Sequence, residues 1–184
     1  MGRKSKFYEA LIEEVVYNSV SDIWEEAVEE WEIYDVKEDE TLETSCICGH
    51  DHLRYLFTIE NKLNGRFLYP IGSSCIKKFG RCDLKHEVEV QMQLFQLLHA
   101  VEQRRFLELS PEYFSRRLFA YLFEMGAFKP SQYNNNNPES DYYFMLDMFN
   151  KRSMTEKQKR KVDAIIIGSI KPFLQKTLAG KVKK

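Results

Sequence analysis

The chain has 184 residues, of which 43% are hydrophobic, 14% aromatic and 30% charged, and it contains 8 glycines, 5 prolines and 4 cysteines. This length and composition predict an ordered, mostly helical globule in a reducing compartment rather than a secreted disulfide scaffold. No apolar run approaches the roughly 18 residues of a membrane span and no signal peptide opens the chain, so we expect a cytoplasmic protein with no membrane partner.

The net charge of −1 conceals two poles of opposite sign. Residues 1–45 carry 4 basic and 14 acidic side chains, a net charge of −10, whereas residues 46–184 carry 23 basic and 14 acidic ones, a net charge of +9. An asymmetry of this kind gives information about binding partners rather than about fold.

Residues 5–31 have apolar side chains at helical spacing, and we expect two helices that are broken near residues 18–21. Ser21 is the expected N-cap of the second helix. The polar face of that helix is predicted to be a rigid acidic surface for a partner, formed by Glu25, Glu26, Glu29 and Glu30. Ordinary solvent exposure is the other interpretation of these glutamates. The alternation over residues 31–36 predicts an edge strand that joins the following hairpin.

The next stretch, residues 46–79, predicts a metal site. Cys46 and Cys48 precede a glycine, which makes a tight turn, and the alternating residues 53–60 form a strand that an Asn-Gly turn joins to a return strand. Because a hairpin brings its two ends together, we expect Cys75 to return to the first two cysteines. Three thiolates and one imidazole form the Cys3His set of a structural zinc site.

His50 is the favoured fourth ligand, and His52, Cys82 and His86 are the open alternatives. Free buried thiols are the main competing interpretation, since cysteine is among the most buried residue types, and a disulfide is the third. A closed site with four protein ligands leaves no position for water, so we expect the zinc to stabilise the fold and not to catalyse a reaction.

The rest of the chain is predicted to be helical. We expect a short helix capped by Ser73 or Ser74, a long amphipathic helix over residues 84–107, and a helix that starts at Ser110 and ends at Gly126. The asparagine-rich residues 129–140 predict a loop and the best candidate boundary in the chain.

After that loop, residues 141–149 are predicted to be helical, and Thr155 with Gln158 predicts a capping box at the start of the last helix. Pro172 is expected to kink or end that helix, and residues 181–184 form a basic tail.

Two groups of basic residues are candidates for nucleic-acid binding. Lys77, Lys78 and Arg81 follow the third cysteine, and the first turns of the last helix carry Lys157, Lys159, Arg160 and Lys161. Basic side chains at a helix start oppose the helix dipole, so they do not serve helix stability, whereas contact with phosphate would give them a role. A solubilising role is the alternative.

The chain resembles a zinc motif of small proteins from phages and other mobile elements of Gram-positive bacteria. The matching elements are Cys46-x-Cys48-Gly49, a strand, Asn61-x-x-x-Gly65, and Pro70-Ile71-Gly72-Ser73-x-Cys75-Ile76-x-x-Phe79. Residues 141–162 are similar to a helical segment that often follows the motif. This family includes type II-A anti-CRISPR proteins, which inhibit Cas9, and the resemblance implies that this protein acts in a bacterial host cell on Cas9 or on its complex with guide RNA.

We therefore expect an α+β fold, predominantly helical, with a zinc-pinned antiparallel β-hairpin and a helical bundle. The expected segments are 1–45 (acidic and helical), 46–82 (the zinc hairpin) and 83–184 (helical, with a basic last helix). No phosphate-binding glycine loop, His-Glu-x-x-His or nucleophile elbow occurs in the sequence, so we expect a non-catalytic Cas9 inhibitor. The alternatives are a phage accessory protein that binds double-stranded DNA or RNA and, as a minority view, a metal-dependent nuclease.

Overall fold

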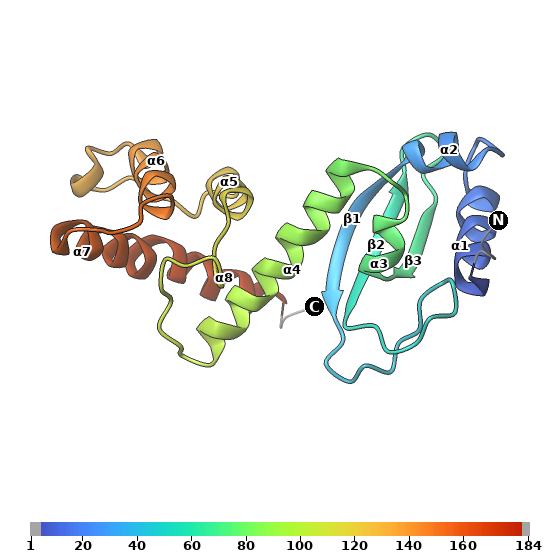
Figure 1. Cartoon of the computed structure of the whole chain (residues 1–184), viewed down its shortest axis with the longest axis horizontal. Coiled ribbons are helices and arrows are strands. Elements are labelled where there is room, and N and C mark those ends of the chain that lie inside the picture. The colour runs from blue at the N-terminus through green and yellow to red at the C-terminus, as the bar shows by residue number, and fades with distance from the viewer. Residues whose placement is uncertain (1–4, 182–184) are drawn as a thin grey trace. The chain divides into compact units, whose positions relative to one another are not determined.

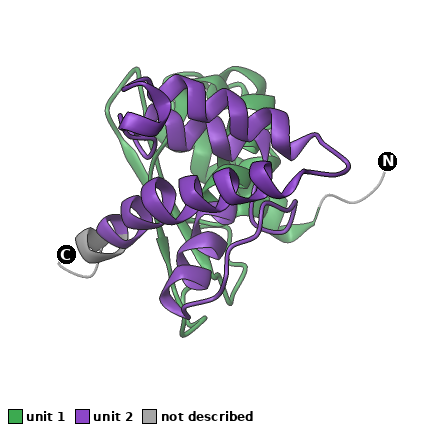
Figure 2. Cartoon of the chain, turned by 90° about the vertical axis from the view of Figure 1, so that its left-hand side faces the viewer, with its two compact units in different colours: residues 1–91 green, residues 92–184 purple. Residues whose placement is uncertain are grey.

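The computed structural model describes residues 5–181, and the side chains of residues 5–177 (Figure 1). It shows the expected α+β fold, in which helices accompany one three-stranded antiparallel sheet. The chain forms two compact units, residues 1–91 and residues 92–184 (Figure 2). The acidic N-terminal segment and the cysteine hairpin therefore belong to the same unit. No helix in the described part of the chain is long and apolar enough to cross a membrane.

The sheet of the first unit has the order β1-β2-β3, with β1 at Trp31–Glu38, β2 at Tyr55–Asn61 and β3 at Phe67–Ile71. Both pairings are antiparallel, so the predicted hairpin and the predicted additional edge strand are confirmed. In β2 the alternate residues Phe57, Ile59 and Asn61 are fully buried, as the period of two along a strand predicts, whereas irregularities in the register interrupt the alternation in the other two strands. The largest fully buried side chains of the sheet are Trp31, Phe57, Ile59 and Ile71.

The N-terminal segment begins with α1, Lys6–Asn18, which Ser5 caps. The second helix is much shorter than expected: α2 covers only Trp24–Ala27, and a 3-10 turn, Val28–Glu30, leads directly into β1. The expectation that Ser21 caps this helix is wrong, because Ile23 stands at the cap position and makes no side-chain cap. The helix stops early because Trp31, fully buried, is already paired in the sheet with Asn61.

Past the sheet, α3 covers Ser73–Lys77 and contacts β2. Neither predicted serine caps α3, because Gly72 is at its N-cap. A side chain at residue 72 would place its Cβ 2.9 Å from Leu53 Cδ2, so the absence of a side chain permits this close approach. The long helix α4 runs over Cys82–Glu102, earlier at both ends than the range expected from the sequence.

In the second unit, α5 covers Arg116–Glu124 and begins at Ser115, whose hydroxyl accepts a hydrogen bond from the Leu118 N–H at 3.1 Å. The predicted start at Ser110 is wrong, because residues 110–114 form an isolated turn. The rings of Phe114 and Phe119 stack with their centroids 5.0 Å apart, and both are fully buried.

The predicted loop 129–140 is more ordered than expected. It contains a 3-10 turn, Gln132–Asn134, and α6 begins inside it, at Pro138–Phe149. The amide of Asn134 is buried and donates hydrogen bonds to Lys129 O and to Asp141 Oδ2, at 2.9 and 2.7 Å. These bonds tie the loop to the helix that follows.

The last helix starts as predicted, with Thr155 in a capping box, and continues as α7 at Glu156–Ile165. A π-helical stretch, Ile166–Ile170, then leads into α8, Lys171–Lys181. Pro172 lacks an N–H donor and its ring would clash with the carbonyl four residues earlier, so the widened turn is the structural consequence of this proline. In the predicted basic tail, residues 182–184 lie outside the described residues.

Candidate metal centre

The first two cysteines lie on a tight loop before β2. The Cys46 N–H donates to His50 O and the Gly49 N–H donates to Cys46 O, both at 2.8 Å. Gly49 has φ +83°, which glycine adopts without strain, so the sequence Cys-x-Cys-Gly closes this turn. The Cys46 and Cys48 side chains are both buried beneath it.

The third cysteine is brought to the loop by the hairpin. Cys75 lies in α3, four residues beyond the end of β3 at Ile71. Ile47 N–H donates to Pro70 O at 2.9 Å, and Gly72 N–H donates to Cys46 Sγ at 3.3 Å. The loop is thus fastened to the end of the returning strand, as the sequence predicts.

The three sulfur atoms form a compact cluster. Cys75 Sγ lies 3.7 Å from Cys46 Sγ and 3.4 Å from Cys48 Sγ, and all three thiols are free. A disulfide would require about 2.05 Å, whereas sulfurs that share a tetrahedral zinc with bonds of about 2.3 Å lie about 3.8 Å apart. The spacing therefore fits three thiolates around one metal ion, and the cluster can hold one.

The cluster also favours ionisation of one thiol. The hydrogen bond from Cys75, aided by backbone N–H groups of Cys48 and Gly72, lowers the pKa of Cys46 to about 5, although burial opposes this shift. The same contact with Cys46, together with burial, raises the pKa of Cys75. The thiolate is the form that binds metals, so Cys46 is available as an ionised ligand at neutral pH.

The structure places the predicted fourth ligands outside the cluster. Among the described residues, no histidine, carboxylate or further cysteine has a ligand atom within the 4.8 Å that groups the three sulfurs. The His50 ring is exposed and packs edge-on against Phe7, with centroids 5.6 Å apart. His52 Nδ1 is 3.0 Å from Leu42 O, Cys82 is exposed, and His86 is half-buried on α4.

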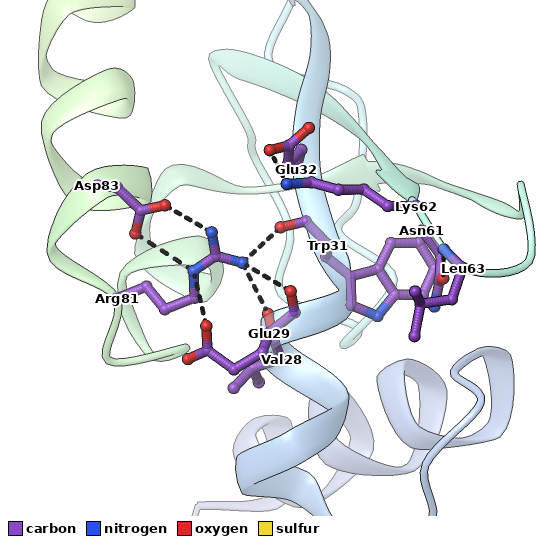
Figure 3. Close-up of polar contacts among 9 residues, drawn as sticks. All are labelled: Val28, Glu29, Trp31, Glu32, Asn61, Lys62, Leu63, Arg81 and Asp83. Atoms are coloured by element: carbon purple, nitrogen blue, oxygen red, sulfur yellow. Dashed lines mark hydrogen bonds and ion pairs between the residues drawn. The ribbon is translucent and has the colours of Figure 1, made fainter.

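The predicted phosphate contact Arg81 is used inside the protein instead (Figure 3). Its Nη1 donates to Trp31 O at 2.7 Å, to Val28 O at 3.1 Å and to Glu29 O at 3.4 Å. The other side of the guanidinium pairs with Asp83, with Nη2 2.5 Å from Oδ2. The side chain is only 12% exposed, so the assignment of Arg81 to nucleic-acid binding is corrected to a structural role.

The two lysines before Arg81 are exposed. Lys77 points to solvent, and Lys78 Nζ lies 5.6 Å from the centre of the Tyr8 ring, a cation–π contact. Both are accessible on the surface close to the cysteine cluster.

Two of the four basic residues predicted at the start of the last helix are paired with acidic side chains. Lys159 Nζ lies 3.1 Å from Glu156 Oε1. Lys161 Nζ lies 3.3 Å from the buried Asp141 and 4.3 Å from the centre of the Phe144 ring. The remaining two members, Lys157 and Arg160, are exposed.

One of the four glutamates predicted to form the acidic surface is buried. Glu25, Glu26 and Glu29 are exposed, but Glu30 is only 6% exposed. Its carboxylate accepts hydrogen bonds from the backbone N–H groups of Val20 and Ser21, both at 2.7 Å. Glu30 therefore has a structural role and cannot contribute to a partner surface.

Asn61, for which the sequence predicts no role, completes this arrangement. Its side-chain amide donates to Glu30 at 2.5 Å, and its carbonyl accepts from the N–H groups of Leu63 and Asn64, at 2.9 and 3.2 Å. The motif Asn-x-x-x-Gly carried the signal, because an asparagine at the start of a hairpin turn commonly bonds to the backbone of that turn.

Comparisons with protein-family models, with curated proteins and with solved structures found no significant match to this chain.

Proposed function

We propose that the metal is zinc and that its role is structural, with Cys46, Cys48 and Cys75 as three of its ligands. The spacing of the three buried sulfurs supports this proposal. The proposed fourth ligand is His50, whose backbone is already bonded to Cys46. Zinc would then fix the loop before β2 to the helix after β3.

We further propose that the protein is a non-catalytic anti-CRISPR protein of a phage or mobile element, which binds type II Cas9 in the cytoplasm of a bacterial host. The resemblance of the zinc motif carries this proposal, and the convergence of its three cysteines supports it. Cas9 holds nucleic acid in positively charged channels, and the exposed carboxylates of Glu25, Glu26 and Glu29 are suited to such a surface.

A binding titration against guide-loaded Cas9, with labelled duplex DNA in parallel, tests this function. We expect a complex with Cas9 that persists in moderate salt and that is weakened when Glu25, Glu26 and Glu29 are changed to glutamine. The matched control changes the exposed Glu112, Glu139 and Glu156 to glutamine, which lowers the negative charge equally at other places. Absence of a complex between the wild-type protein and Cas9 would overturn the proposal.

Binding of nucleic acid without Cas9 is the second candidate function. It is favoured by the exposed Lys157 and Arg160 at the start of α7, for which the described residues provide no ion-pair partner. If this function holds, Lys157→Ala with Arg160→Ala weakens binding to duplex DNA, and the affinity falls steeply with salt. Equal DNA binding by the variant and the wild type would contradict it.

A further inference from the structure

An exposed apolar patch lies where the end of α1 meets the turn between β2 and β3. It consists of Tyr17, Val20 and Leu63, whose side chains are 81%, 64% and 68% exposed. Asn64 donates its amide to Asn18 O at 2.9 Å, which holds the two segments together. Three large apolar side chains exposed together, with a polar rim, are typical of a protein interaction site.

The patch borders two open hollows with acidic walls. The first, of about 490 Å³, has Val20 and Leu63 on its walls together with the exposed Glu26 and Glu29. One oxygen of Glu29, Oε2, lies 3.6 Å from Arg81 Nε. Among the described residues, Lys62 is the only basic one on its walls, and it is paired with Glu32 (Figure 3).

The second hollow, of about 680 Å³, is lined by residues of α1 together with Asp22 and Trp24. It is lined by the aromatic rings of Tyr17 and Trp24. The acidic residues that line it, Glu13, Glu14 and Asp22, are all exposed. None of its walls is basic among the described residues.

The combination of aromatic rings, aliphatic side chains and carboxylates selects one kind of occupant. A guanidinium group stacks on an aromatic ring and forms two parallel hydrogen bonds with a carboxylate, and its aliphatic stem packs on apolar side chains. Two basic residues lie beside the patch: Lys62 is paired with Glu32, and Arg66 donates to Tyr17 O at 3.3 Å. The carboxylates that line the two hollows outnumber them, so the net charge around the patch is acidic. Phosphate groups of nucleic acid or of anionic lipid would be repelled.

We propose that this patch docks a basic segment of a partner protein and that the two hollows receive arginine side chains of that segment. This inference refines the proposed function. It rests on the proposed function only for the assumption that the partner is a protein. It extends the binding surface from Glu26 and Glu29 to the junction of α1, α2 and the hairpin turn.

A peptide titration tests the surface without Cas9. A deca-arginine peptide is added to the full-length protein, and the amide NMR signals are followed, with a deca-lysine peptide and anionic phospholipid vesicles run in parallel. We expect shifts at residues 17–26 and 62–64, tighter binding of the arginine peptide than of the lysine peptide, and no binding of vesicles at these residues. Shifts spread over other acidic surfaces, or binding of the vesicles at these residues, would overturn the inference.

A variant that keeps the charge separates this site from simple attraction between charges. Val20→Ser with Leu63→Ser is expected to weaken binding of the arginine peptide about fivefold, because the stems of the arginines lose their apolar contacts. The matched control is Phe106→Ser, at a side chain of similar exposure (63%) in the second unit, which should bind as the wild type does. Equal affinity of the double variant and the control would contradict the proposal.

The same variants with guide-loaded Cas9 separate the two proposals. If the peptide maps to the patch and Cas9 does not bind, the surface stands and the Cas9 assignment fails. If Cas9 binds the double variant as tightly as the wild type, the Cas9 assignment stands and the docking surface fails.

Discussion

Arg81 is a single residue that joins the end of the expected hairpin segment, residues 46–82, to the segment before it. Its guanidinium bonds to carbonyl groups on either side of the turn that starts β1, and to Asp83 at the start of α4. Among the described side chains, only Arg81 donates hydrogen bonds to the carbonyl groups of Val28 and Trp31. Removing Arg81 would take a charged donor from both carbonyl groups in a partly buried position.

We therefore predict that Arg81→Ala lowers the free energy of unfolding by about 2 kcal/mol, the range for hydrogen bonds to a charged group. Lys77→Ala, in the exposed part of the same basic group, should change it by less than about 0.5 kcal/mol. Urea denaturation of both variants, each with zinc supplied in excess, measures these changes. Equal effects of the two substitutions would contradict the structural role of Arg81.

Glu30 provides a second prediction at this scale, through pH. Burial raises the pKa of its carboxyl, but the hydrogen bonds from Val20, Asn61 and Ser21 outweigh burial, and the pKa falls below its ordinary value of 4.5. A carboxyl whose pKa is lower in the folded state stabilises the protein above the unfolded value and loses this contribution as the pH falls through the folded value.

The free energy of unfolding should thus differ most between wild type and Glu30→Gln near neutral pH, and the difference should shrink as the pH falls below about 4.5. The exposed Glu25→Gln serves as the control and should show no such trend. A constant difference between wild type and Glu30→Gln across this range would contradict the assigned hydrogen bonds.

At the scale of elements, the helix α5 gives a direct comparison between two serines. Ser110 precedes a proline and matches the sequence pattern of a helix start, but Ser115 makes the cap. We predict that Ser115→Ala lowers the free energy of unfolding by about 1 kcal/mol and that Ser110→Ala has a smaller effect. Urea denaturation monitored by circular dichroism checks this. The reverse order would place the helix start at Ser110.

The elements that the sequence predicts well are those whose determinants are close together in the chain. The hairpin follows from alternation and an Asn-Gly turn, and the approach of Cys75 to Cys46 and Cys48 follows from the hairpin. The capping box at Thr155 is likewise contained in four residues.

The elements that the sequence misplaces depend on distant partners. The early end of α2 follows from the pairing of Trp31 with Asn61, 30 residues away in sequence, and the burial of Glu30 depends on the same asparagine. The role of Arg81 depends on carbonyl groups about 50 residues earlier in the chain. Local patterns contain no information on such contacts.

At the scale of the whole molecule, the cysteine cluster belongs to the first unit alone. We predict that chelation of the metal raises the hydrogen-exchange rates of amides in β2, β3 and α3, because the loop and α3 lose their common anchor. The amides of α5, α6 and α7 in the second unit should exchange as before. Equal acceleration in both units, measured by mass spectrometry, would contradict this localisation.

The zinc content of the protein purified without added metal tests the proposed metal centre most directly. We predict one zinc ion per chain in the wild type and in Cys82→Ser, since Cys82 is exposed and lies outside the cluster, and a large loss of zinc in Cys75→Ser. Elemental analysis against protein concentration gives the ratio. A wild-type protein that contains no zinc, binds none when it is supplied and keeps all four of its thiols free would contradict the metal centre.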